Sequence, residues 1–255
     1  MATPEHERPG HHSGMTRREI APQPLLCELH SHTTWSDGTL SVQEVVDLYG
    51  MAGFDVLCVT DHVVRADHPT GPMIDGTTYD AYLETIAEEA ERARETYGLL
   101  LIPGVELTDS DPDPDRAAHA LAVGLDRLVT LDHGLPAALR EARAAGAATI
   151  AAHPHSSEQD SIPGRTTRRF SREPDRLRPL IDRYELINRT DVFSWVAAEG
   201  LPGVASGDFH MRAHLETWKT VLPCEKSPVA VIAHLRSDRP SFVTRFTAIT
   251  SGVAA

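Results

Sequence analysis

The stretch Leu26-Cys-Glu-Leu-His30-Ser-His32-Thr-Thr-Trp-Ser-Asp37-Gly38 is an apolar run that ends in two histidines and a carboxylate. Residues 25–29 are short, mostly apolar and preceded by prolines, which predicts a buried strand. Alternate side chains of a strand share a face, so His30 and His32 can reach one metal ion. Asp37, in a Ser-Asp-Gly turn, can return an oxygen ligand to the same place. A lone His-x-His is a weak motif, however, and this stretch alone also fits a polar strand end with two surface histidines.

Apolar runs bounded by a polar or ionisable residue recur along the chain. They lie at residues 54–62, 99–106, 119–124, 147–154, 184–188 and 204–210, which with the first run makes seven predicted strands. Helical patterns at 41–52, 79–97, 135–145 and 174–183 lie between them. Strands alternating with helices favour parallel pairing, so we expect an α/β fold, a closed or nearly closed (β/α)7 barrel with its site at the C-terminal mouth of the strands. An open doubly wound sheet is the main alternative, but the chain has no Gly-rich nucleotide-binding motif.

The composition narrows the class of protein. The chain has 255 residues, which is a common length for one α/β barrel. It has 37 Asp+Glu against 24 Lys+Arg, and this acidic balance argues against a surface that binds nucleic acid or an anionic membrane. Its three cysteines lack CxxC spacing, which predicts reduced thiols and a cytoplasmic location. No run approaches 18 apolar residues, and the N-terminus has no apolar h-region, so we expect neither a membrane span nor a secretion signal. Residues 1–22 are rich in Pro, Gly, His and charge, and they predict a disordered tail before a single domain at 23–255.

The predicted strands and the turns beside them supply ten nitrogen and oxygen donors: His30, His32, Asp37, Asp61, His62, Glu106, His119, His153, Asp208 and His210. Each alone has an ordinary explanation, such as a helix cap or a surface histidine. Together at one mouth, the carboxylates would repel one another unless cations compensated, so we predict a polynuclear metal site. Imidazole and carboxylate donors without thiolate suit Zn, Mn or Fe. Glu106 is the best candidate to bridge two metals about 3.5–4 Å apart that also share a nucleophilic hydroxide.

Taken together, these motifs resemble the polymerase-and-histidinol-phosphatase (PHP) metal-dependent phosphoesterases. The resemblance extends from about residue 25 to 237 in the order of the family. It rests on His30-Ser-His32 with Ser36-Asp37-Gly38, Thr60-Asp61-His62, Pro103-Gly-Val-Glu106, His153-Pro154 and Gly207-Asp208-Phe-His210. It implies a PHP-type distorted (β/α)7 barrel that holds two or three divalent metal ions.

The resemblance also implies which residues hold each metal. His30, His32, Glu106 and Asp208 would hold the first, Glu106, His119 and His153 the second, and Asp37, His62 and His210 the third. The sequence around His119 matches the family only loosely. Glu185 and Asn188, in a strand that ends Glu-x-x-Asn, are expected to be structural rather than ligating.

Hydrolysis of a phosphoester is the reaction that the resemblance implies. Metal ions would polarise the phosphoryl oxygens while the bridging hydroxide attacks. Asp61 or His155 is expected to supply a proton to the leaving group, and Asp61 alternatively orients His62. The candidate phosphate ligands are Arg165, Arg168, Arg189 and Arg212, each of which also fits an exposed basic loop.

We expect the substrate to be a small phosphorylated metabolite or nucleotide. The chain is too short to carry a polymerase, and it has no aromatic or basic stripe for a long nucleic acid. Two alternatives stay open: hydrolysis of a carbon ester, carbamate or amide at the same site, and a non-catalytic metal-binding module. Residues 218–226 predict an edge element for which the sequence suggests no chemical role.

Overall fold

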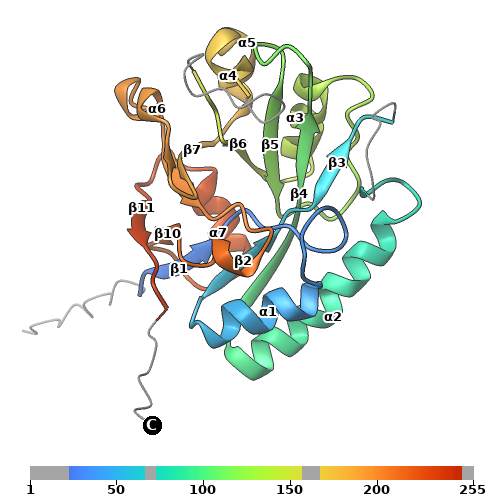
Figure 1. Cartoon of the computed structure of the whole chain (residues 1–255), viewed down its shortest axis with the longest axis vertical. Coiled ribbons are helices and arrows are strands. Elements are labelled where there is room, and N and C mark those ends of the chain that lie inside the picture. Colours follow the sequence, from blue (N-terminus) through green and yellow to red (C-terminus); the bar gives the residue numbers. More distant parts are fainter. Residues whose placement is uncertain (1–22, 67–72, 157–166, 249–255) are drawn as a thin grey trace, which may run out of the picture.

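The computed structural model describes residues 23–66, 73–156 and 167–248, so the predicted tail at 1–22 lies outside it. The described strands join one curled sheet in the order β11-β10-β1-β2-β4-β5-β6-β7-β8, with β3 beside β4 and β9 beside β7 (Figure 1). The strands are β1 (Leu25–Glu28), β2 (Val56–Val59), β3 (His62–Val64), β4 (Leu100–Asp109), β5 (Ala118–Val123), β6 (Ala148–Ala152), β7 (Arg183–Asn188), β8 (Asp191–Val192), β9 (Gly203–Ser206), β10 (Trp218–Leu222) and β11 (Phe242–Arg245). The α-helices are α1 (Val42–Met51), α2 (Tyr79–Tyr97), α3 (Leu135–Ala144), α4 (Arg169–Arg172), α5 (Pro174–Leu177), α6 (Ser194–Ala198) and α7 (Pro228–Leu235). The predicted α/β class is therefore confirmed.

Strand β5 runs against both of its neighbours, and this corrects the expectation of uniformly parallel pairing. Strands β1, β2 and β4 are parallel, as are β6, β7 and β9, whereas β5 is antiparallel to β4 and to β6. The connection from β4 to β5 contains no helix, which allows the chain to turn back directly. Because β5 is reversed, its second residue His119 pairs with Thr108 and Ala152 at the C-terminal ends of β4 and β6.

The chain after β9 returns to β1 and curls the sheet upon itself. Phe209 donates its backbone N–H to His30 O (3.0 Å), and His32 donates to Phe209 O (2.7 Å). Lower in the sheet, the Thr220 hydroxyl donates to Ala205 O (2.7 Å) and so links β10 to β9. This closure sets the two residues that flank Phe209 beside the two histidines of the first strand.

Three of the four predicted helices are confirmed as α1, α2 and α3. Ser41 and Glu44 form a capping box at the start of α1, which fixes where the helix begins. The helix predicted over 174–183 is only partly right, because it is one turn of α5 followed by a 3-10 turn at Arg178–Leu180. Pro179 has no N–H to donate and its ring opposes further helix, so the chain leaves the helix there and enters β7.

Two apolar cores lie on the two faces of the sheet. Val56 and Cys58 of β2 point into the inner core, whereas Leu57 and Val59 belong to the outer core. This is the alternation that a strand imposes. Helices α1 and α2 lie side by side over the outer face (Figure 1). Among the described helices, none combines the length and apolar character needed to cross a bilayer.

Arg183 fastens α7 to the start of β7. Its buried guanidinium donates to the backbone oxygens of His234, Leu235, Ser237 and Arg239, at and beyond the end of that helix. The last carbonyls of a helix have no partner within the helix, and this side chain bonds two of them: Leu235 O and His234 O, the second of which also accepts from Ser237.

We expect Arg183→Met to lower the free energy of unfolding by about 2–4 kcal/mol, because several buried carbonyls lose a charged donor. Urea denaturation followed by circular dichroism measures the change. Arg94→Met, at an exposed position of α2, is the control and should change the free energy by less than about 0.5 kcal/mol. Equal effects of the two substitutions would contradict this role of Arg183.

Candidate metal centre

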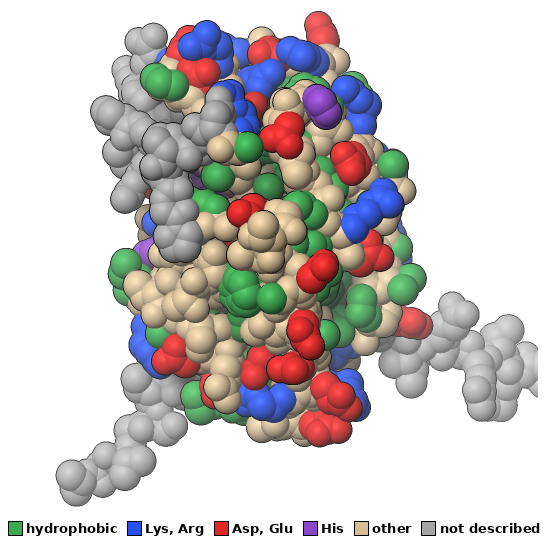
Figure 2. All heavy atoms as spheres, turned by 90° about the vertical axis from the view of Figure 1, so that its right-hand side faces the viewer, with side chains coloured by type: hydrophobic (Ala, Val, Ile, Leu, Met, Phe, Trp, Pro, Cys, Tyr) green, Lys and Arg blue, Asp and Glu red, His purple; other side chains and the backbone are tan. Residues whose placement is uncertain are grey.

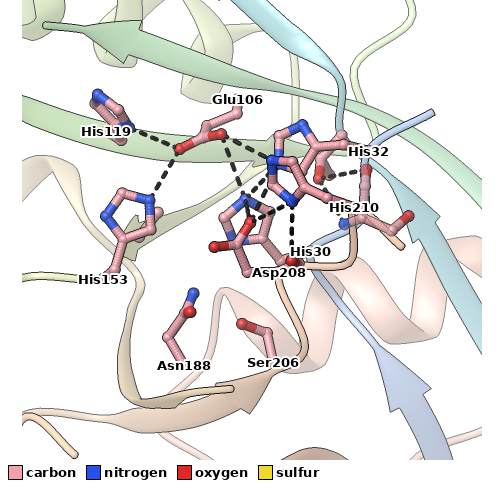
Figure 3. A network of polar contacts seen from close by, with 12 residues as sticks. His30, His32, Glu106, His119, His153, Asn188, Ser206, Asp208 and His210 are labelled. Carbon is pink, nitrogen blue, oxygen red and sulfur yellow. Dashed lines mark hydrogen bonds and ion pairs between the residues drawn. The ribbon is translucent and has the colours of Figure 1, made fainter. Parts of the chain in front are cut away.

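Three overlapping groups of potential ligands meet where the strands end. Within each group, one ligand atom from every residue lies within 4.8 Å of the others. The groups are His30, His32 and Glu106; Glu106, His119 and His153; and His32, Asp37, His62 and His210. They match the three metal positions expected from the sequence, except that His32 also joins the third group and Asp208 lies beside the first. The structure thus brings all nine expected ligands together. Figure 3 labels these ligands except Asp37 and His62.

Glu106, on β4, lies at the junction of these groups. Oε1 is 3.0 Å from His119 Nδ1 and 3.3 Å from His153 Nε2. Oε2 faces the other side, at 3.0–3.4 Å from ring nitrogens of His30, His32 and His62. Burial alone would raise the pKa of Glu106, but the charges of His62 and His30 and the bonds to the other rings hold it well below its ordinary value. The carboxylate therefore stays ionised and presents one oxygen to each of two ligand groups, as a bridging ligand must.

His30 and His32 stand on the extension of β1 with their Nε2 atoms 3.0 Å apart. Asp208 Oδ1 lies 3.5 Å from each of them. Burial, together with the charges of neighbouring rings, lowers the pKa of His32 to about 3. Burial also disfavours the charged form of His30, but nearby carboxylates, Asp208 foremost, raise its pKa well above the ordinary value. Two buried rings and a carboxylate that converge in this way are a suitable place for a cation.

The third group is the most open part of the centre. Asp37 is half exposed, and its Oδ1 lies 3.2 Å from His210 Nε2 and 3.4 Å from His62 Nε2. Burial would raise the pKa of Asp37, but these two rings hold it well below the ordinary value. Asp37 is thus an ionised oxygen donor on the solvent side of the centre.

Polar partners orient several of the rings. Glu185 Oε1 lies 2.9 Å from His30 Nδ1, and Thr108 Oγ1 lies 2.7 Å from His62 Nδ1. Ser110 Oγ lies 3.2 Å from His119 Nε2. A partner on one ring nitrogen fixes the orientation and tautomer of a ligating histidine. Sequence reasoning missed Thr108 and Ser110, although their spacing of two and four residues from Glu106 on a strand was a usable signal.

Glu185 holds the other ligand segments as well. It accepts from the backbone N–H of His153 (2.6 Å) and from Asn188 Nδ2 (2.7 Å), and the Ser206 hydroxyl also donates to it. Burial would raise the pKa of Glu185, but the charges of His30 and His153 and the hydrogen bonds with His30 and Ser206 hold it below the ordinary value. These contacts agree with a structural role for Glu185 and Asn188.

Asp61 is turned toward the loop that carries Asp37. Its fully buried carboxylate accepts from Thr33 N (2.7 Å), Thr33 Oγ1 (2.9 Å) and Ser36 Oγ (2.6 Å). Burial raises the pKa of Asp61 despite these bonds. Its contacts favour positioning of the 33–36 turn over the transfer of a proton to a leaving group.

The candidate proton donor His155 and the four candidate phosphate-binding arginines do not all lie in the centre. His155 belongs to none of the three ligand groups, and its ring packs edge-to-face on Phe193. Arg168 Nε lies 2.7 Å from Asp115 Oδ1, Arg212 is exposed, and Arg165 lies outside the described residues. Arg189 Nη2 lies 3.0 Å from Asp208 Oδ2 and 3.1 Å from His210 Nδ1. Of these arginines, the structure therefore brings Arg189 into the centre, where it holds two expected ligands.

The backbone is strained at the same place. The non-glycine residues of the described part with positive φ are His153 (30°), Arg189 (53°) and Asp208 (42°). Such conformations cost on the order of 1–3 kcal/mol each and persist where the surroundings enforce them. All three belong to the centre or contact it directly, a clustering that is common at functional sites.

We expect Glu185→Gln to weaken metal binding about 10–100-fold, the usual effect of removing an outer partner of a ligating histidine. Competition with a fluorescent chelator measures the affinity. Glu199→Gln, at a partly exposed ion pair, is the matched control and should bind as the wild type does. An unchanged affinity in Glu185→Gln would show that His30 does not depend on this carboxylate.

Metal binding should release protons at pH 7.5. Burial disfavours the charged form of His62, but Glu106 and Asp37 raise its pKa to about 10, so the ring carries a proton until a metal displaces it. Affinity should consequently fall as the pH falls. Calorimetric titration with Mn²⁺ in Tris and in HEPES, whose ionisation enthalpies differ, counts the released protons. Equal binding enthalpies in the two buffers would contradict this expectation.

Comparisons with known proteins identify the fold. No protein-family model and no curated sequence matches the chain. Among solved structures, a two-domain protein from Bacteroides vulgatus that contains a predicted PHP-like metal-dependent phosphoesterase is similar, with a TM-score of 0.59 and 19% identity over 91% of this chain and 70% of that one. PsfC from Pseudomonas syringae has a TM-score of 0.56 and 16% identity over 88% of this chain and 92% of that one. The chain therefore has the fold of PHP-like phosphoesterases, which confirms at the level of the fold the resemblance seen in its motifs.

Proposed function

We propose that the chain is a PHP-type phosphoesterase that hydrolyses a small phosphorylated metabolite or nucleotide with two or three divalent metal ions. The observation that carries the proposal is the position of Glu106, whose two oxygens face two different groups of imidazoles. A mononuclear or purely structural site has no need of a buried carboxylate placed in this way. The nine ligands are His30, His32, Asp37, His62, Glu106, His119, His153, Asp208 and His210.

The donor set fits such ions. It comprises six imidazoles and three carboxylates without a thiolate, which suits Mn, Zn or Fe. The 3.0 Å approach of two buried imidazole nitrogens is satisfied by a cation between them. When bound, metal ions at such a centre polarise phosphoryl oxygens and make water a nucleophile at neutral pH.

The residues of this chain arrange the reactants. Glu106 and the rings of His30 and His32 are buried, whereas Asp37 is half exposed, so a substrate would approach from the side of Asp37. Arg189 would neutralise and hold Asp208 rather than serve the substrate alone. Arg212, exposed after His210, and Arg165 stay candidate phosphate ligands.

A small substrate fits the surface better than a long nucleic acid does. The chain carries a net charge of −13, and on the face that Figure 2 shows, acidic and basic side chains are interspersed and form no continuous basic stripe. The described cysteines Cys27, Cys58 and Cys224 are buried free thiols, which is compatible with the cytoplasmic location expected from the sequence.

We also propose that the curled sheet is a variant of the distorted (β/α)7 barrel. The isolated bridge between Ser31 and Phe209 supports a closed ring of strands, and the reversed β5 is the distortion.

The function is tested by phosphate release from sugar phosphates, nucleotides, cyclic nucleotides and short oligonucleotides with added Mn²⁺. We expect release from at least one small compound, and a loss of at least about 100-fold in His30→Ala and in Glu106→Gln, because each change removes a metal ligand. His133→Ala, at an exposed histidine that belongs to none of the three ligand groups, should retain full activity. Metal-loaded protein that releases phosphate from none of these compounds but cleaves carboxyl esters would refute phosphoester hydrolysis in favour of carbonyl hydrolysis.

A further inference from the structure

Strand β10 is the element for which the sequence suggested no chemical role. It pairs antiparallel with β1, with Cys27 opposite Thr220, so it lies directly beside the strand that leads to the first two histidines. Lys219 of β10 is fully buried, which is rare for a lysine unless it is paired. Its partner is Glu28 of β1, which is also fully buried.

The Glu28 carboxylate joins four segments of the chain. Oε2 accepts from Lys219 Nζ and from the hydroxyl of Tyr49 on α1 (2.9 Å). Oε1 accepts from the backbone N–H of Gly207 (2.8 Å) and of His30 (3.2 Å). Two of these four donors are thus in the backbone beside or within the first ligand group.

Gly207 is packed directly on this ion pair. A Cβ at this position would collide with Lys219 Nζ and Glu28 Oε2, so any residue other than glycine would displace the ion pair. The next residue, Asp208, has a positive φ of 42° and places Oδ1 3.5 Å from His30 Nε2. The ion pair therefore fixes the position of the Gly207 backbone, and with it the point from which the Asp208 side chain extends toward the first ligand group.

A buried ion pair adds little to the stability of a protein, because the cost of desolvating two charges offsets their attraction. An apolar pair of similar volume would fill the same space. Two of the hydrogen bonds that Glu28 accepts, however, come from the backbone of His30 and of Gly207. These two contacts tie the pair to the geometry of the site, which an apolar pair would not do.

We propose that Glu28 and Lys219 are positioning residues that set the distance between His30 and Asp208, and hence the affinity of the first metal position. The inference rests on the proposed function. It concerns the first metal position alone. The second position, formed by Glu106, His119 and His153, has no hydrogen bond with Glu28 or Lys219 within the described residues. Loss of the pair should therefore weaken one metal equivalent and spare another.

The test is the double substitution Glu28→Gln/Lys219→Met, which removes both charges and leaves no unpaired ion in the core. Mn²⁺ titration by calorimetry measures the affinity of each equivalent, and the visible absorption of bound Co²⁺ reports the coordination geometry. We expect one equivalent to weaken about 10-fold or more, with an altered Co²⁺ spectrum, while another equivalent binds as in the wild type. Arg178→Met/Glu199→Gln, which removes a partly exposed ion pair, is the matched control and should change neither measurement.

A folded double variant that binds every equivalent as the wild type does would overturn the inference, and so would equal weakening of all equivalents. If the double variant does not fold, Tyr49→Phe removes one hydrogen bond to Glu28 without changing the charge. It should weaken the same equivalent to a smaller extent, and unchanged binding would again overturn the inference. Wild-type protein that binds no Mn²⁺ would refute the proposed function itself, and the inference with it.

Discussion

The structure depends on one electrostatic constraint, the burial of the Glu106 carboxylate among imidazole rings. With 1% of its surface exposed, this anion needs cationic or hydrogen-bonding partners around it, and five ring nitrogens lie within 3.4 Å of its two oxygens. The fold supplies these ring nitrogens because the ends of its strands converge around Glu106. The reversal of β5 brings His119 to that edge, and the return of the chain to β1 brings Asp208 and His210.

Three further buried carboxylates keep this arrangement in place. Asp61 fastens the turn before Asp37, Glu185 holds His30 and the backbone of His153, and Glu28 holds the backbone before Asp208. Each accepts several hydrogen bonds, which a buried carboxylate requires. The strained backbone of His153 and Asp208 persists under these bonds. The hydrogen bonds of these three buried carboxylates thus fix the ligands from the interior of the protein, while the side of Asp37 stays open to solvent.

Much of the centre could be predicted from the sequence, because strand alternation and polar strand ends are local patterns. They sufficed to identify His30 and His32 as neighbours on one face and Glu106 as the shared carboxylate. The direction of β5 could not be read locally, since it depends on partners that its own residues do not specify. The same holds for contacts between distant segments: Lys219 and Glu28 are 191 positions apart, and Arg189 and Asp208 are 19 positions apart. Pro179, by contrast, was a local signal that should have ended the helix predicted over 174–183.

The most direct measurement of the central claim is anomalous X-ray scattering from crystals grown with Mn²⁺. The account predicts two or three peaks inside the centre, with two of them about 3.5–4 Å apart on either side of the Glu106 carboxylate. Those peaks would contact the imidazoles of His30 and His32 on one side and of His119 and His153 on the other. Full occupancy by a single ion that does not touch Glu106, or the absence of any peak among these residues, would contradict it.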